Sequence, residues 1–119
     1  MKKLFTLMAL VALVGCTEKK PLTPQEQWKG YCTSMGDAAH NIMYDRQNTI
    51  TKQAAIEHAN KIEDQITKTF ILDIIEQVYA FPLQEITQDP EASRNQFKQK
   101  MTAKCIATPH DKMPDYKPF

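Results

Sequence analysis

The chain has 119 residues, of which 15 are lysine or arginine, 14 are aspartate or glutamate, and only three are glycine. This length suits one domain with a modest core. The nearly neutral charge, with no basic cluster, excludes nucleic acid as the partner, because phosphate neutralisation needs concentrated lysine and arginine. The scarcity of glycine and the lack of alternating apolar and polar residues disfavour a β-rich fold, so we expect an all-α protein.

The first sixteen residues have the three parts of a secretory signal. Residues 1–3 are positively charged, residues 4–14 are apolar, and small residues lead into Cys16. The apolar run is shorter than the roughly 20 residues that a membrane span needs. The tetrad Leu13-Val14-Gly15-Cys16 resembles the lipobox of bacterial lipoproteins. The alternative is an ordinary secretory signal that happens to contain a cysteine.

The lipobox resemblance implies how the chain is processed. Residues 1–15 are removed as a signal peptide, Cys16 receives a thioether-linked diacylglycerol, and the new amino terminus is acylated with palmitate. Such chains anchor stably, since each buried methylene contributes about 0.8 kcal/mol. Thr17, rather than aspartate, follows the lipidated cysteine, so the resemblance implies an outer-membrane lipoprotein. We expect the domain to face the periplasm, with the cell-surface leaflet as the alternative. Processing leaves 104 residues and, because two lysines are lost, a net charge of −1.

Residues 16–22 form a polar tether, and residues 23–107 are predicted to form the helical domain. Thr23 is suited to cap the first helix, Pro24 to occupy its first position and Glu26 to complete a capping box. Apolar residues then recur at helical spacing to about Arg46. They are Trp28, Cys32, Met35, Ala39 and Ile42.

Two small features of this first helix carry predictions. Gly36 lies in the middle of the helical pattern, where it costs about 1 kcal/mol relative to alanine. Its missing side chain lets a second helix approach closely. Asn48 suits the left-handed backbone position at which a helix ends.

A second helical region runs from a cap at Thr51 to Ala80. Its apolar stripe consists of Ala55, Ala59, Ile62, Ile66, Phe70, Ile74 and Val78. The pattern allows one long helix or two helices with a bend at residues 60–64, and we favour two. Pro82 ends the region, because it lacks an amide proton and disfavours helical geometry at the residue before it.

The remaining residues give a connector, a last helix and a tail. Residues 83–88 read as a connector, and Asp89-Pro90 begins a helix that places Phe97, Met101 and Cys105 on one line. Residues 108–119 contain three prolines, so they are predicted to form a loose, non-helical tail.

Cys32 and Cys105 remain once Cys16 carries lipid. In an oxidising compartment an exported protein is expected to join them as a disulfide. Both thiols face inward from the first and last helices of the domain. Metal binding by this pair is disfavoured, because neither cysteine belongs to a C-x-x-C pair or has a histidine at ligand spacing.

No group of residues forms a complete catalytic or metal-binding set. Asp37, His40 and Tyr44 lie on nearby turns of the first helix, but no nucleophile or oxyanion donor accompanies them, so we interpret them as a solvated polar face. His40, His58 and His110 are not spaced as metal ligands. We therefore expect no enzyme, no cofactor and no metal.

The end of the first helix and the aromatic residues have structural interpretations. Arg46 and Gln47 follow the last apolar turn, and Arg46 is expected to bond the final carbonyls of its own helix rather than a ligand. Core packing is expected for most of the aromatic residues, with a pocket or partner surface as the alternative. These are Trp28, Tyr31, Tyr44, Tyr79 and Phe81.

The mature part resembles small exported helical proteins of proteobacteria. The residues that carry this resemblance are Tyr31-Cys32, Ala38-Ala39, Ile42-Met43 and Arg46-Gln47, with Cys105 after Phe97. It implies a helical fold braced by a disulfide and names no activity. Together with the helices predicted above, we expect a small bundle of three to four helices braced by one disulfide between Cys32 and Cys105. The sequence departs from the pattern at Asn48, where glycine is the usual helix terminator.

Two function classes follow. The first is a membrane-anchored interaction or accessory module that binds another envelope protein through a groove or apolar patch. The second is a stress chaperone, similar to the small disulfide-linked acid-response proteins of the enteric periplasm, that binds unfolded clients through the isoleucine-rich helix. The partner, and any small-molecule ligand, is not named by the sequence.

Overall fold

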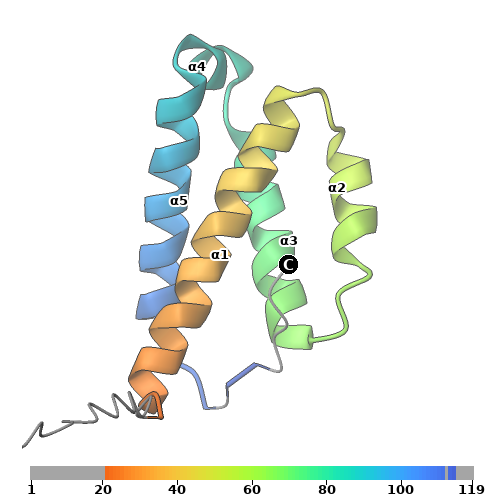
Figure 1. Cartoon of the computed structure of the whole chain (residues 1–119). Coiled ribbons are helices and arrows are strands. Elements are labelled where there is room, and N and C mark those ends of the chain that lie inside the picture. The colour runs from red at the N-terminus through yellow and green to blue at the C-terminus, as the bar shows by residue number, and fades with distance from the viewer. Residues whose placement is uncertain (1–20, 112, 115–119) are drawn as a thin grey trace, which may run out of the picture.

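The computed structural model describes residues 21–111, 113 and 114. The predicted signal peptide, the lipidation site Cys16, most of the tether and residues 112 and 115–119 of the tail lie outside these described residues. The described chain forms five helices and no strand, which confirms the all-α prediction (Figure 1). They are α1 (Pro24–Gln47), α2 (Lys52–Ala59), α3 (Gln65–Ala80), α4 (Leu83–Gln88) and α5 (Pro90–Ala107).

The start of α1 has the predicted cap at Thr23 and the predicted proline, but the end of the helix differs from the prediction. The Thr23 hydroxyl oxygen accepts a hydrogen bond from the backbone N–H of Glu26 at 3.2 Å, and Pro24 occupies the first turn. At the other end Asn48 has φ −105°, and the left-handed residue is Thr49, with φ 70°. The prediction for Asn48 is therefore wrong by one residue. Its backbone N–H and its side-chain amide both bond the Tyr44 carbonyl, which holds it outside the left-handed region.

The second helical region is divided into two helices, as favoured from the sequence. Thr51 caps α2 by accepting from the N–H of Ala54 at 3.1 Å, and Asp64 caps α3 by accepting from the N–H of Thr67 at 2.7 Å. A side-chain cap satisfies an N–H group that has no partner within its helix. The second cap at Asp64 therefore explains why a new helix begins there.

Residues 83–88 form the short helix α4 and not the connector that was predicted. The segment lies between Pro82 and Pro90, and its sequence does not have the apolar spacing of a helix. Ile86 is fully buried, and its carbonyl accepts a hydrogen bond from the Gln47 amide nitrogen at 3.2 Å. Tertiary contacts of this kind override a weak local propensity.

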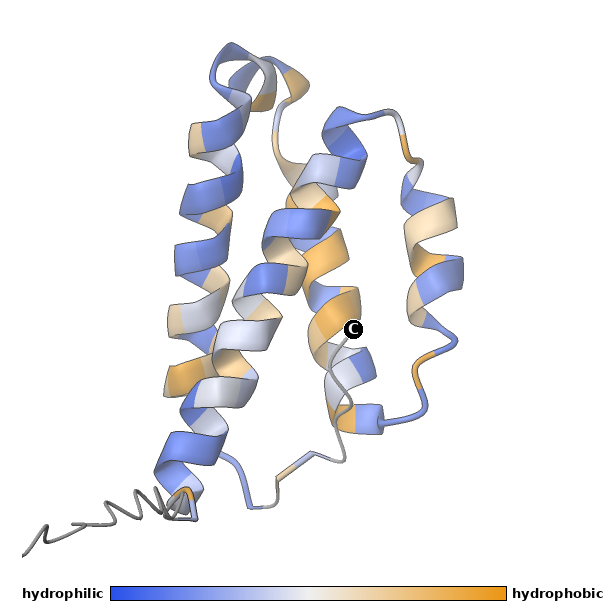
Figure 2. Cartoon of the chain, in the orientation of Figure 1, coloured by the Kyte–Doolittle hydropathy of each residue, from blue (hydrophilic) through white to orange (hydrophobic). Residues whose placement is uncertain are grey.

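The core lies between α1, α3 and α5. Helix α1 packs against both α5 and α3, while α2 packs against α3. Figure 2 shows the apolar residues of α3 in the middle of the bundle and hydrophilic outer faces on α1 and α5. The largest fully buried side chains include Met35, Met43, Ile74, Ile75 and Met101. The predicted stripe is wrong at Ile66, which is 39% exposed, because the buried row of α3 instead begins at Thr67.

A disulfide joins the first and last helices, as predicted. Cys32 and Cys105 have Cα atoms 5.3 Å apart, and both side chains are fully buried. One turn later, a Cβ placed on Gly36 would lie only 1.8 Å from the Thr102 hydroxyl oxygen. The close approach expected at Gly36 is thus observed, and its partner is α5.

Part of the predicted tail is packed rather than loose. The ring of His110 stacks on Trp28 with centroids 3.7 Å apart, and Pro114 is buried. Residues 108–111, 113 and 114 are non-helical, as predicted. Stacking on an aromatic face that would otherwise be exposed explains why this segment stays against the bundle.

Candidate functional site

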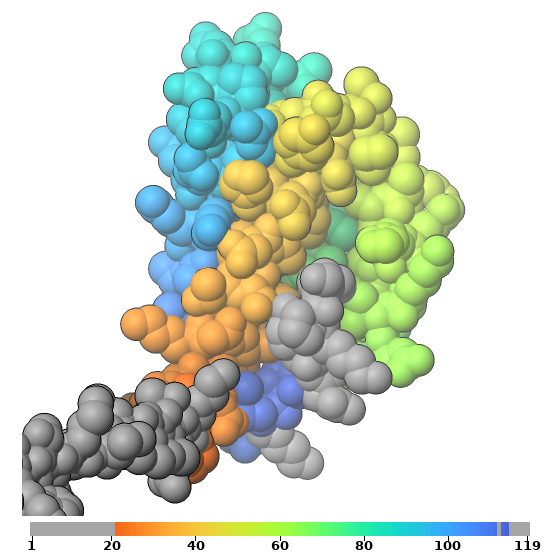
Figure 3. Space-filling view, viewed as in Figure 1, coloured from red at the N-terminus to blue at the C-terminus, as the bar shows by residue number. Residues whose placement is uncertain are grey.

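A cleft lies between α1 and α2, with α3 as its floor. Its volume is about 540 Å³. In Figure 3, α1 and α2 form the near walls and α3 is visible deeper between them. The lining residues come from α1 (Ser34, Asp37, Ala38, Asn41, Ile42, Asp45), from α2 (Ala54, Ala55, His58, Ala59), from the loops beside α2 (Ile50, Ile62) and from α3 (Ile71, Ile75).

The cleft exists because α2 packs on α3 and not on α1. The short helix carries alanine where a longer side chain would reach across, at positions 54, 55 and 59. Two contacts hold α2 and its preceding loop to α3. The Tyr79 hydroxyl donates to the Ile50 carbonyl at 2.6 Å, and the Lys52 ammonium lies 2.8 Å from the Glu76 carboxylate.

The chemistry of the cleft is apolar inside and acidic on one edge. Buried Ile71 and Ile75 form the floor, while the carboxylates of Asp37 and Asp45 lie on the α1 side. Among the residues that the structure describes, no lysine or arginine lines the cleft. Asp37 is paired with Lys98 of α5 at 2.8 Å, whereas the structure gives Asp45 no ion pair within residues 21–111. A ligand with apolar groups beside one cation therefore matches this surface.

The charge of Asp45 is also felt by Tyr79. Burial raises the pKa of the Tyr79 hydroxyl above its usual value near 10, and the Asp45 carboxylate raises it further. The neighbouring Arg46 guanidinium lowers this pKa and only partly offsets the two other effects. The phenol donates to the carbonyl of Ile50, which lines the cleft.

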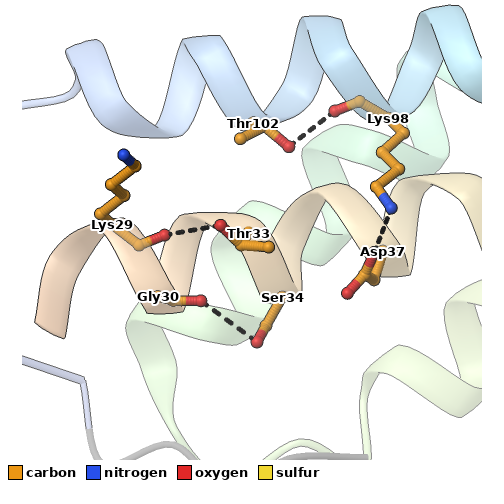
Figure 4. A network of polar contacts seen from close by, with 7 residues as sticks. All are labelled: Lys29, Gly30, Thr33, Ser34, Asp37, Lys98 and Thr102. Atoms are coloured by element: carbon orange, nitrogen blue, oxygen red, sulfur yellow. Dashed lines mark hydrogen bonds and ion pairs between the residues drawn. The ribbon is translucent and has the colours of Figure 1, made fainter. Parts of the chain in front are cut away.

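The residues considered for proton transfer do not assemble into one site. Asp37 is paired with Lys98, as Figure 4 shows. The Arg94 guanidinium carbon lies 5.5 Å from the centroid of the Tyr44 ring. Both contacts are made with α5. His40, half-buried on α1, is not among the residues that line the cleft. The polar face interpretation fits these positions, because each carboxylate or phenol has a structural partner.

The three histidines lie on separate parts of the molecule. His40 is on α1, His58 lines the cleft from α2, and His110 stacks on Trp28 after α5. Within the described ranges, no three histidine, cysteine, aspartate or glutamate side chains gather closely enough to hold a metal ion.

Arg46 and Gln47 act on other helices. The Arg46 guanidinium donates to the Val78 carbonyl at the end of α3 and lies 5.4 Å above the Tyr79 ring. The prediction that Arg46 bonds its own helix is therefore wrong. Gln47 donates to the Ile86 and Pro90 carbonyls and accepts from Arg94 at 2.8 Å. Sequence patterns do not contain these contacts, because they depend on how the helices are placed in space.

Core packing is confirmed for most of the aromatic residues. Trp28 and Tyr31 are buried and stack with centroids 5.2 Å apart, and Phe81 packs edge-on to Phe97. Tyr44 is the exception, with half of its side chain exposed. None of these five aromatic residues lines the cleft.

The sequence predicts a groove or an apolar patch in general terms, but it does not predict a cleft between α1 and α2. Its only local signal is the run of small residues in α2, which is also compatible with tight helix packing. No described helix combines the length and the apolar character that crossing a membrane requires. Comparison of the chain with protein-family models, with curated proteins and with solved structures finds no match.

Proposed function

We propose that this protein is a lipid-anchored envelope lipoprotein that acts as a protein-interaction or accessory module. Cys16 carries the anchor, residues 17–22 form the tether, and the helical domain presents the cleft to a second envelope protein in the periplasm. The membrane and that protein are the proposed partners, and no catalytic step is included. The outer membrane is the proposed location.

The observation that supports this proposal is the apolar cleft between α1 and α2. A monomeric domain of this size normally fills such a space with its own side chains, and a concave apolar surface rimmed by polar groups is typical of a recognition site. The cleft extends along α1 from Ser34 to Asp45, which corresponds to about 16 Å at 1.5 Å per residue. An amphipathic segment with apolar side chains and one cation fits this length and this lining.

Photo-crosslinking in intact cells tests the proposal. A benzoylphenylalanine replaces Ala54, which is exposed and lines the cleft, in the full lipidated chain. We expect one defined adduct, whose crosslinked peptide on the captured protein contains apolar residues and a lysine or arginine. The matched control places the same probe at Gln99, on the exposed face of α5.

A second variant separates cleft binding from incidental proximity. Ala55→Glu puts a charge into the cleft wall and should abolish the adduct, whereas Gln53→Glu on the outside of the same helix should preserve it. Equal adducts from positions 54 and 99, or an adduct that survives Ala55→Glu, would contradict the proposal.

The chaperone remains the alternative proposal. It requires exposure of the α3 isoleucines at low pH, and Ile71, Ile74 and Ile75 are buried in this structure. A hydrophobic dye that binds no more strongly at low pH than at neutral pH would reject it.

A further inference from the structure

The cleft is lined by two aspartates and one histidine. Asp37 and Asp45 line it from α1, and His58 lines it from α2. The floor on α3 contributes only isoleucine among the described residues. Because Asp37 is paired with Lys98, the charge of the lining at neutral pH comes mainly from the Asp45 carboxylate.

His58 lies opposite the middle of the α1 wall. Residues 48–51 join α1 to α2, and this short connection makes the two helices antiparallel, as Figure 1 shows. In that view the C-terminal end of α2 is level with the middle of α1, and His58 belongs to the last turn of α2. The cleft extends about 16 Å along α1, so the imidazole lies on the order of 10 Å or less from a group bound anywhere in it.

The other charged groups of α2 and α3 lie outside the lining. Lys52 is paired with Glu76 at 2.8 Å, and the Glu57 carboxylate accepts from the Gln53 amide at 3.4 Å. The loop at residues 60–64 contributes only an isoleucine to the lining among the described residues. The charged side chains of this region that do not line the cleft are Lys52, Glu57, Lys61, Glu63, Asp64, Lys68, Asp73 and Glu76.

Protonation of His58 therefore changes the charge of the cleft and leaves its shape in place. Histidine is the side chain whose ordinary titration falls between pH 5 and 8. While His58 is neutral, the lining is anionic through Asp45, and the imidazolium balances that charge once His58 is protonated. The imidazolium would also lie at the C-terminal end of α2, where the helix dipole favours a cation, so protonation does not loosen this wall.

We propose that His58 regulates the cleft: a basic amphipathic partner binds while His58 is neutral and is released when acidification protonates it. The inference rests on the proposed function, because it concerns the same cleft and the same partner. A unit charge about 10 Å from a bound cation weakens its binding about two- to fifteenfold, for effective dielectric constants between about 80 and 20. The apolar part of the contact does not respond to this charge.

Crosslinking to a defined peptide tests the regulation. The mature chain, purified from cells with benzoylphenylalanine at position 54, is irradiated with a helical peptide of about eleven residues, which spans about 16 Å. The peptide consists of leucine and alanine with one central lysine, and a matched peptide carries uncharged acetyl-lysine there. Adduct yield against peptide concentration gives the apparent affinity at about pH 7.5 and about pH 5.5. The salt concentration is kept low, because about 0.1 M salt screens charges beyond about 10 Å.

We expect the lysine peptide to bind about two- to fifteenfold more weakly at the lower pH and the acetyl-lysine peptide to bind equally at both. His58→Gln should remove the pH dependence of the lysine peptide. His40→Gln is the matched control, because His40 lies on α1 and does not line the cleft, and it should retain the dependence. Circular dichroism at both pH values establishes that the variants remain folded.

Three results would overturn the inference. They are equal binding of the lysine peptide at both pH values, a pH dependence that persists in His58→Gln, and an equal loss of the acetyl-lysine peptide at the lower pH.

Partner capture distinguishes failure of this inference from failure of the proposed function. In cells, the probe at position 54 should capture less of the envelope protein at about pH 5.5 than at about pH 7.5. A protein captured equally at both pH values rejects the regulation and supports the interaction module. The expected response to the lysine peptide, with no protein captured in cells, supports the regulation and rejects the interaction module. No adduct with either peptide and no captured protein rejects both.

Discussion

The contact between α1 and α5 gives a sharp prediction at Gly36. A Cβ added there would lie 1.8 Å from the Thr102 hydroxyl oxygen and 3.0 Å from the Lys98 carbonyl oxygen. The hydroxyl donates to that same carbonyl at 2.7 Å, as Figure 4 shows, so moving it away breaks this hydrogen bond. The Thr102 Cβ would still lie 3.2 Å from the added atom, so Gly36→Ala both disturbs this bond and strains the contact between the two helices.

The magnitude follows from two opposing effects. Overpacking of a well-filled contact costs about 1–3 kcal/mol, and the backbone carbonyl at the site places Gly36→Ala in the upper half of that range. Alanine recovers about 1 kcal/mol of helix propensity. We expect a net loss of about 1–2 kcal/mol in the free energy of unfolding, or roughly 5–10 °C in Tm for a domain of this size.

Gly30 supplies the matched control on the same helix. A Cβ at Gly30 meets nothing within 4 Å. Gly30→Ala should therefore stabilise the protein by about 0.5–1 kcal/mol. Urea denaturation of both variants with the disulfide intact measures the difference. The reasoning is refuted if Gly36→Ala is as stable as Gly30→Ala. Thr102→Ala combined with Gly36→Ala should recover part of the loss.

Three further predictions concern other contacts. Replacing both Cys32 and Cys105 by alanine should destabilise the fold by about 4 kcal/mol, because the disulfide links residues that are 73 positions apart and restricts the unfolded chain. Urea denaturation measures this loss, and a value below about 1 kcal/mol would contradict the prediction. Arg46→Met should lower the free energy of unfolding by about 1–2 kcal/mol and speed amide hydrogen exchange in the last turn of α3, because the Val78 carbonyl loses its charged donor. Unchanged exchange in that turn would argue against the contact. The pKa of Tyr79 is raised in the folded state, so the free energy of unfolding should fall as the pH increases from about 10 toward that higher value. Tyr79→Phe should flatten this decline in alkaline denaturation curves. An equally steep decline in the variant would count against the shift.

The sequence predicts the helices well because their signals are local. Thr23, Thr51 and Asp89 each cap the helix that follows them, as a residue pattern alone suggests. Cys32 and Cys105 are joined, as expected for a chain with the predicted secretory signal. These predictions require only neighbouring residues or the redox state of the compartment.

The sequence does not predict features that depend on how the helices are placed. Residues 83–88 form α4 because Ile86 is buried against the bundle, and Arg46 bonds the end of α3 because the two helix ends meet. The cleft has the same origin, since the alanines of α2 open a space only when α2 packs on α3 alone. His110 stacks on Trp28 although the prolines around it suggest a loose tail.

The proposed envelope lipoprotein requires two modifications of its cysteines, the lipid on Cys16 and the disulfide between Cys32 and Cys105, and one measurement tests both. The intact mass of the protein extracted from cell membranes, determined before and after thiol labelling under denaturing conditions, reports acylation and free thiols together. We predict a chain that begins at Cys16, carries a diacylglycerol and an acyl group, and takes up no label until it is reduced. An unacylated chain in which Cys32 and Cys105 take up label without reduction would contradict the account.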